Sequence, residues 1–528
     1  MGLKKRLAIG FLFVISSCAQ VRPLEGGAKD EAAPKPDMQN ASPVLGSTSI
    51  SPSVIRIAFD EYIKLNNPAK TISITPELPT KPIVEVSGRE LTIQIESKDL
   101  LANTTYSIVF NKAISDLNEG NDTTFTYVFS TGQFIDSLNY SVVLIDAETL
   151  QPVSDAMIGL FVSTDTLDPY TQKPKYLAQT DKTGKANFQY LGAQDLAVFA
   201  YNLNGLNKIS ADSPIAFRTN LIEIDTTWVT DTLRIFTPKV VPSRGSVLKK
   251  NLDSRGRITV VTNFDFEPSV ALIKNNENYV DFSVEETPRS DSSIFWILAQ
   301  ENFNYEIQIP YQDTLISAKV STRKIDLDKS KIINNLDNGE LEINESLTFS
   351  FDFPIQSINP QNLLVYQDNV LIPEIEYSIE NLRNLKILSE FEPESTFQLV
   401  ILPNSITFYD GTLFTDSIVV NFKRKGASKY ANLELVLENL PDMPLVIYLH
   451  SNGQIVAKQI VELTQNIVSF KQLKPGEYTI QVAYDWNNNG VWDTGSWQNN
   501  TQPEVIVWFT QPITLRANWD TKQPLAFQ

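Results

Sequence analysis

Residues 53–63 read SVIRIAFDEYI, and apolar side chains stand at alternate positions through this stretch. Because successive side chains of an extended strand point to opposite faces, this period of two predicts a strand with one buried face. Asn, Gly, Pro and Asp separate further stretches of the same kind, which lie at 91–95, 106–110 and 125–129. Short alternating strands at this spacing predict a β-sandwich, and no long stretch has a convincing helical period.

The same pattern returns later in the chain. Residues 347–355 (LTFSFDFPI) repeat the apolar and acidic order of 55–63 (IRIAFDEYI), and residues 470–487 resemble 188–204. Since the two pairs occur in the same order, they predict a two-module unit present twice, with one module between the copies. The repeat places four aromatic residues inward: Phe59, Tyr106, Phe351 and Phe397. Chance similarity between strands, which draw on few residue types, is the alternative.

The amino terminus predicts secretion. Lys4, Lys5 and Arg6 precede an apolar run at 7–15, which is shorter than the about 20 residues that a membrane-spanning helix needs. Small residues then precede Cys18, the only cysteine of the chain. This arrangement resembles the bacterial lipobox, which implies cleavage before Cys18 and a stable lipid anchor on the new first residue.

Composition excludes several classes of function. The 528 residues contain 44 basic and 62 acidic side chains, a net charge of −18, which argues against a nucleic-acid partner. One histidine and one cysteine exclude disulfides, thiolate zinc sites and multi-histidine metal sites. The chain has no nucleophile-elbow motif and no phosphate-binding loop, so it predicts no catalytic residue and no enzyme.

Several motifs resemble a known family of envelope proteins. Residues 39–132 are similar to the SbsA-type Ig-like module of Bacteroidota outer-membrane lipoproteins, and the segments that carry this similarity are 59–63, 103–106, 114–121 and 129–132. The stretches 23–30, 485–495 and 516–520 also resemble those lipoproteins. Residues 133–240 and 427–528 resemble transthyretin-like or carboxypeptidase-regulatory-like modules. The resemblance implies an outer-membrane anchor and no established activity.

The sequence therefore predicts an all-β chain, a tandem array of about five Ig-like and transthyretin-like β-sandwich modules. The predicted divisions are a lipoprotein signal peptide at 1–17, a flexible tether at 18–38, an SbsA-type Ig-like domain at 39–132, a transthyretin-like sandwich at 133–240, an Ig-like sandwich at 241–325, a second Ig-like domain at 326–426 and a transthyretin-like module at 427–528.

One loop near the carboxyl terminus is a candidate calcium site. Its ligands would be Asp485, Asn487, Asn489, the main-chain oxygen of Val491, and Asp493. Calcium prefers six to eight oxygens, so water or a distant acid such as Glu504 or Asp520 would have to complete the site. With two carboxylates the predicted affinity is weak, about 10⁻⁴–10⁻³ M. The favoured alternative is a turn held by its own side-chain hydrogen bonds, and no cofactor is required.

Five of the seven tryptophans also gather in this region: Trp486, Trp492, Trp497, Trp508 and Trp519. Tryptophan is frequent at binding hot spots and stacks on sugar rings, although it also fills cores, so these residues are candidate binding aromatics. His450 ends an alternating stretch before a hairpin-turn signal, which predicts a solvent-facing turn histidine rather than a catalytic one.

The predicted function is a non-enzymatic, outer-membrane-anchored scaffold or adhesion-type interaction protein. Its expected partners are the membrane, reached through the lipid on Cys18, and another envelope protein. One alternative is an accessory subunit of an outer-membrane transport or protein-assembly complex, and another is a glycan-binding or glycan-processing accessory protein. The residues just after Cys18 carry no acidic run, so the cell-surface and periplasmic faces both stay open.

Overall fold

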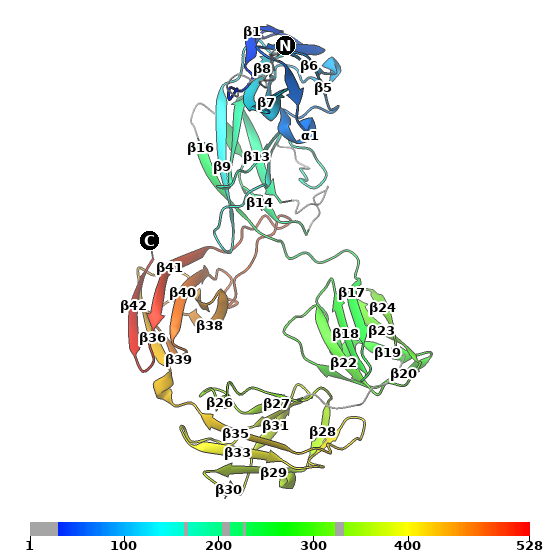
Figure 1. The fold of residues 1–528 in the computed structure, drawn as a ribbon, viewed down its shortest axis with the longest axis vertical. Coiled ribbons are helices and arrows are strands. Elements are labelled where there is room, and N and C mark those ends of the chain that lie inside the picture. Colours follow the sequence, from blue (N-terminus) through cyan, green and yellow to red (C-terminus); the bar gives the residue numbers. More distant parts are fainter. Residues whose placement is uncertain (1–29, 163–166, 203–211, 225–228, 323–331, 528) are drawn as a thin grey trace, which may run out of the picture. The chain divides into compact units, whose positions relative to one another are not determined.

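The computed structural model describes residues 30–162, 167–202, 212–224, 229–322 and 332–527. Within these residues the regular elements are almost all β-strands (Figure 1), and no helix is long and apolar enough to cross a membrane. Contacts divide the chain into two units. The first ends at Ile235, and the second runs from Phe236 to the carboxyl terminus and includes the short segments 147–150 and 211–213.

The first module has the strand order of an Ig sandwich. Its strands are β1 (Pro36–Ser42), β2 (Val54–Phe59), β3 (Ile63–Leu65), β4 (Ile72–Thr75), β5 (Ile83–Ser87), β6 (Glu90–Gln94), β7 (Thr105–Asp116) and β8 (Asp122–Ser130). One sheet has the order β1-β2-β6-β5, and in the other β7 pairs with β3, β4 and β8. In chain order this is the ABED and CFG arrangement of Ig domains, with β3 as an addition.

The third module repeats that arrangement. Its strands are β17 (Val247–Leu252), β18 (Arg257–Thr262), β19 (Leu272–Asn275), β20 (Asn278–Tyr279), β21 (Phe282–Glu285), β22 (Ser292–Ile297), β23 (Asn304–Tyr311) and β24 (Thr314–Ser321). The sheets are β17-β18-β22-β21 and β20-β19-β23-β24. This is again the ABED and CFG arrangement, with β20 added beside the third main strand.

The fourth module also has this order. Its strands are β25 (Ile333–Asn334), β26 (Glu340–Leu341), β27 (Thr348–Ser350), β28 (Ile355–Ile358), β29 (Leu363–Gln367), β30 (Val370–Ile372), β31 (Tyr377–Glu380), β32 (Asn384–Ile387), β33 (Thr396–Ile401), β34 (Ile406–Phe408) and β35 (Ile418–Arg424). The sheets are β25-β27-β32-β31 and β26-β35-β33-β29-β30, and β28 pairs with β34.

The three Ig-like modules share one local detail that the sequence analysis missed. Between the second and third main strands of each stands a single helical turn that begins with proline: α1 (Pro68–Thr71), η2 (Pro268–Val270) and η3 (Pro360–Asn362). Proline suits this position because its fixed φ matches a helical turn and its missing N–H has no partner there. The sequence shows no long stretch with a helical period, and α1, with four residues, is too short to show one.

The second and fifth modules share a different topology. The second contains β9 (Leu138–Asp146), β10 (Met157–Val162), β11 (Tyr176–Gln179), β12 (Lys185–Leu191), β13 (Gln194–Tyr201), β14 (Ile215–Phe217), β15 (Ile222–Ile224) and β16 (Val229–Ile235). The fifth contains β36 (Ala431–Glu438), β37 (Leu445–Ser451), β38 (Gln454–Val461), β39 (Ile467–Leu473), β40 (Gly476–Tyr484), β41 (Ile506–Leu515) and β42 (Asp520–Ala526).

In both of these modules the last strand pairs in parallel with the first. The sheets are β12-β9-β16 with β11-β10-β13-β14 in one, and β39-β36-β42 with β38-β37-β40-β41 in the other. A bulge recurs at the same place, with Tyr190 and Gln472 at φ values of 60° and 56°. The strand orders thus agree with the internal repeat read from the sequence.

The predicted core residues of the repeat are buried. Phe59 and Tyr106 lie in the core of the first module, and Phe351 and Phe397 lie in that of the fourth. The predicted divisions at 133, 241 and 427 fall between strands, while the division at 326 lies outside the described residues. The predicted tether, 18–38, extends too far toward the carboxyl terminus, because β1 begins at Pro36 and the side chain of Met38 packs against the first core.

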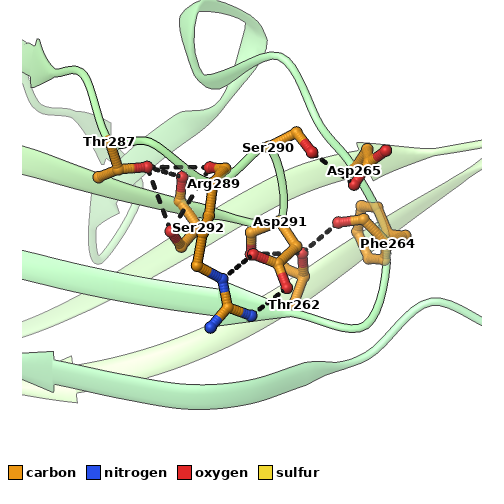
Figure 2. A network of polar contacts seen from close by, with 8 residues as sticks. All are labelled: Thr262, Phe264, Asp265, Thr287, Arg289, Ser290, Asp291 and Ser292. Atoms are coloured by element: carbon orange, nitrogen blue, oxygen red, sulfur yellow. Dashed lines mark hydrogen bonds and ion pairs between the residues drawn. The ribbon is translucent and has the colours of Figure 1, made fainter. Parts of the chain in front are cut away.

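A compact polar network closes one end of the third module. Figure 2 shows that the Thr287 hydroxyl donates to the main-chain oxygens of Arg289 and Ser292, at 2.9 and 2.7 Å. The Arg289 guanidinium binds the Asp291 carboxylate, with Nε 2.8 Å from Oδ1. The Ser290 hydroxyl donates to Asp265 at 2.7 Å. These side chains bind one another and the main chain, so the network holds the turn before β22.

Two Ig-like modules carry a tyrosine that ties their sixth main strand to the preceding loop. Tyr106 and Tyr305 are each the second residue of that strand. Their hydroxyls accept hydrogen bonds from the main-chain N–H groups of Leu101 (2.7 Å) and Gln300 (2.9 Å), five residues upstream. Such a corner is typical of Ig sandwiches. In the fourth module Phe397 occupies the equivalent place without a hydroxyl.

We expect Tyr106→Phe and Tyr305→Phe each to lower the free energy of unfolding by about 1 kcal/mol, because each removes one buried hydrogen-bond acceptor. Hydrogen exchange resolved by peptide reports the modules separately and measures the change. Tyr279→Phe is the control, since Tyr279 lies in the third module with 65 % of its surface exposed. An equal loss from Tyr279→Phe would contradict the role of the corner.

Candidate functional site

The candidate calcium loop begins where β40 ends. Asp485 follows this strand and is fully buried, because the loop folds back over it. Its carboxylate accepts hydrogen bonds from two main-chain N–H groups, those of Asn489 (3.0 Å to Oδ1) and Gly490 (2.7 Å to Oδ2). Asp485 therefore holds the turn together from inside.

The remaining candidate ligands complete the turn. The Asn487 side-chain oxygen accepts from the Asn489 N–H at 3.1 Å, and the Asn489 side-chain oxygen accepts from the Val491 N–H at 2.9 Å. Both asparagine amides donate to Oδ2 of Asp493, each at 2.6 Å. The structure thus brings the predicted residues together, and it engages their side chains in hydrogen bonds within the loop.

Glu504 binds the loop from the strand side. It is buried, and its two carboxylate oxygens accept from the N–H groups of Trp486 (2.8 Å) and Asp493 (2.9 Å). Burial raises the pKa of Glu504, and the carboxylates of Asp493 and Asp485 raise it further, against the two N–H donors that lower it. The other distant acid considered, Asp520, instead accepts from the Asn432 amide at 2.7 Å.

Gly490 allows the loop to lie against the edge strand β38. Its φ of 77° is in the left-handed region, which favours glycine. A Cβ atom at this position would stand 2.7 Å from Cδ1 of Ile460, and Nζ of Lys458 donates to the Gly490 carbonyl at 2.8 Å. Sequence analysis missed Lys458 and Ile460, because only the pairing of β38 with β37 brings them to the loop.

These contacts match the favoured expectation of a turn held by its own hydrogen bonds. Within the described part of the chain, no group of three or more His, Cys, Asp or Glu residues is placed to hold a metal ion. Asp485 and Glu504 already use both carboxylate oxygens on N–H donors. A calcium ion would therefore compete with hydrogen bonds that the loop already makes.

Two of the candidate tryptophans serve a second, smaller core. Trp492 and Trp508 pack against Val446, Ala483 and Ile506 on the outer face of the sheet that contains β37 and β40. The Trp492 indole N–H donates to the Glu504 carbonyl at 3.0 Å. These two residues are half-buried and stabilise the module. Trp497 is also half-buried, and its carbonyl accepts from the Asn500 N–H.

The two exposed tryptophans lie at opposite ends of the module. Trp486, 51 % exposed, follows the end of β40, whereas Trp519, 60 % exposed, precedes β42 beside the Arg516 guanidinium. Because β40 and β41 are antiparallel, the length of β41 separates them, about 30 Å at about 3.3 Å per residue. The five tryptophans therefore do not form one binding platform.

His450 occupies a different environment from the one predicted. It lies within β37 rather than in the turn, and it is half-buried. Its Nε2 atom lies 2.8 Å from Oε1 of Gln481, and its ring centroid lies 4.8 Å from that of Trp508. The expectation of a solvent-facing turn was wrong because the strand extends one residue further and its outer face is covered by aromatic side chains.

A buried acid also holds a turn in the first module. Asp116 is 1 % exposed, and its carboxylate accepts from the N–H groups of Glu119 (2.5 Å), Gly120 (2.9 Å) and Asn121 (2.7 Å). Burial raises the pKa of Asp116, but these donors lower it more, so its pKa lies below the usual value. This is the same use of a carboxylate as in the 485–493 loop.

Cys18, the predicted lipidation site, lies outside the described residues.

The comparison with family models supports an Ig-like fold for the first module. The family described as bacterial Ig-like domain matches residues 32–131. No curated protein matches the chain. The solved structures that resemble it include BcpA, the major pilin subunit of Bacillus cereus, at 12 % identity over 74 % of this chain and 99 % of that one, with a TM-score of 0.15. The Bacillus anthracis TIE protein is 12 % identical over 95 % of this chain and 76 % of that one, with a TM-score of 0.14.

We expect the full chain to bind calcium no more tightly than about 10⁻⁴ M, because its loop oxygens are already hydrogen-bonded. Calorimetric titration with calcium chloride measures the affinity, and a chelator should shift the melting temperature by less than about 2 °C. Asp493→Asn is the matched variant, since it removes one candidate carboxylate and leaves Asp485 intact. A micromolar affinity that Asp493→Asn abolishes would establish a structural metal site instead.

Proposed function

We propose that this chain is a non-enzymatic scaffold of the bacterial outer membrane, anchored through lipid on Cys18, which holds interaction surfaces on a series of Ig-like sandwiches. The observation that carries the proposal is that, within the described residues, each of the five modules is the centre of a hydrophobic core. Each module thus buries its apolar side chains between its sheets and leaves its edges and loops for binding. Folds of this kind host many functions, so the role follows from what these surfaces present.

The use of the buried polar side chains supports a role without catalysis. Asp116, Asp485 and Glu504 accept hydrogen bonds from main-chain N–H groups of neighbouring turns. His450 pairs with Gln481 and packs on Trp508. A general base or nucleophile needs a side chain that can reach a substrate, whereas the three acids bind the protein's own backbone and His450 binds a side chain.

The edge strand β38 supports an envelope protein as the partner. It lies at the edge of its sheet, and three of its aliphatic side chains are about half exposed: Ile455 (53 %), Val456 (50 %) and Ile460 (45 %). Leu463 and Ile467 extend this apolar surface toward β39. An edge with unpaired main-chain groups and apolar side chains suits the addition of a strand from another protein.

A glycan ligand is the second candidate, and the exposure of Trp486 favours it. Trp486 belongs to the loop 485–493, and a planar aromatic surface next to polar side chains suits a sugar ring. Trp519 lies at the other end of the module, so a glycan site would use Trp486 without it.

An accessory subunit of an outer-membrane transport or assembly complex would bind through β38 instead.

We expect Cys18→Ala to leave a folded protein that no longer fractionates with membranes, because the predicted anchor is a lipid on this thiol. Metabolic labelling with a palmitate analogue, followed by membrane flotation, measures both properties. Ser16→Ala is the control, since it keeps a small residue before the cysteine. Membrane association of the unlabelled Cys18→Ala variant would contradict the anchor.

We expect an integral membrane protein to co-purify with the native chain in near-stoichiometric amount. Val456→Lys should abolish this co-purification, because a charge would disrupt the apolar edge of β38. Leu248→Lys is the matched control on β17, another edge strand, where Leu248 is 61 % exposed. Quantitative mass spectrometry of the purified complexes compares the two variants. Glycan-array binding that Trp486→Ala removes, without a protein partner, would favour the glycan candidate.

A further inference from the structure

We infer that the third, fourth and fifth modules form one rigid arm, because a buried glutamate at each of their two junctions binds side chains of the neighbouring module. This inference goes beyond the proposed function, since it concerns how the modules are held together and not what they bind. It applies whether or not Cys18 carries lipid.

The first junction is centred on Glu285, the last residue of β21 in the third module. It is 6 % exposed, and its carboxylate accepts two hydrogen bonds from Arg383 of the fourth module. The Nε atom of Arg383 lies 2.8 Å from Oε2, and Nη2 lies 2.6 Å from Oε1. Arg383 also donates through Nη1 to the carbonyl of Phe351 at 2.6 Å. A bidentate pair of this kind fixes the orientation of both groups.

Trp296 extends the first junction into an apolar contact. It belongs to β22 of the third module, yet it is 1 % exposed and packs within the hydrophobic core of the fourth module. Its ring meets that of Phe353 edge-on, with centroids 5.6 Å apart. The indole N–H donates to Oε2 of Glu285 at 2.8 Å, and the Arg383 guanidinium lies 5.8 Å from the ring centroid. Rotating the modules apart would expose the ring and the ion pair together.

A second ion pair stands at the same junction. Arg255 of the third module binds Asp352 of the fourth, with Nη1 2.9 Å from Oδ1. The two side chains are only 16 % and 29 % exposed, so water screens them less than it screens a surface pair.

Burial raises the pKa of Glu285, but the hydrogen bonds from Arg383 and Trp296 lower it more, so the carboxylate stays charged.

The second junction is centred on Glu342, which follows β26 in the fourth module and is 7 % exposed. Its carboxylate binds Nζ of Lys425 (2.8 Å), the Tyr430 hydroxyl (2.5 Å) and Nζ of Lys474 (3.0 Å). Tyr430 directly precedes β36, and Lys474 lies between β39 and β40, so both belong to the fifth module. The Tyr430 hydroxyl also accepts from the Ile343 N–H at 3.0 Å.

The charge of Glu342 is held by these partners. Burial raises the pKa of Glu342, but hydrogen bonds from Lys425, Tyr430 and Lys474 outweigh it and lower the pKa to about 2. Separating the fourth and fifth modules would remove Tyr430 and Lys474 from a buried carboxylate. Loss of one partner from a buried pair leaves a charge without compensation, which is strongly unfavourable. Both junctions are therefore expected to keep a single orientation.

Pulsed electron–electron double resonance, which measures distances between spin labels, tests this inference on the full chain. The native cysteine is first removed by Cys18→Ser. Spin labels are then attached to pairs of introduced cysteines at three exposed positions: Glu277 in the third module, Gln361 in the fourth and Lys471 in the fifth. We expect a narrow distance distribution across each junction. Arg383→Met should broaden the 277–361 distribution, and Glu342→Gln the 361–471 distribution, each by about twofold or more.

Two matched variants serve as controls. Lys386→Met breaks the Glu380–Lys386 ion pair of the fourth module, and Lys522→Met breaks the Glu434–Lys522 pair of the fifth, each within one module. Neither should change the distance distributions. Broad distributions in the unaltered junctions would overturn the inference, as would equal effects of the junction and control variants. If Arg383→Met unfolds the fourth module in circular dichroism, the width measured with both junctions intact still decides the question.

Discussion

Each module is stabilised by burying every second side chain of its strands between two sheets. In β2, Ile55 and Ile57 are fully buried while the intervening Arg56 is exposed, and the same alternation continues through the paired strand β6. Five such sandwiches bury five cores, and each core needs residues from both of its sheets. Because the apolar side chains are used in this way, the edges and loops are what remains for binding.

Three buried carboxylates in this chain hold the backbone of tight turns. Asp116 and Asp485 each collect main-chain N–H groups of a tight turn, and Glu504 fastens the second of these turns to its sheet. A turn leaves N–H groups that a strand would have paired, and a carboxylate satisfies them more strongly than a neutral acceptor. This explains why the 485–493 loop resembles a metal-binding sequence while its oxygens already bind protein donors.

The junctions between the last three modules use different chemistry from the turns. Glu285 and Glu342 bind arginine, lysine, tyrosine and tryptophan side chains that come from a neighbouring module. Such contacts are directional, and they are lost together if the modules turn. An array of modules held in this way would present the edge strand β38 and the loop of Trp486 in a constant direction.

The strands, the internal repeat and the inward aromatics such as Phe59 and Phe397 could be predicted from the amino-acid sequence, because alternation within a strand is a local property. The turn at 485–493 could be predicted too, since its hydrogen bonds join residues only a few positions apart. The sequence could not predict that Glu504 binds the Asp493 N–H, that β41 separates Trp519 from Trp486, or that Arg383 binds Glu285. A period of two in the sequence indicates the face on which a side chain lies, whereas the strand or module beside it depends on contacts between distant residues.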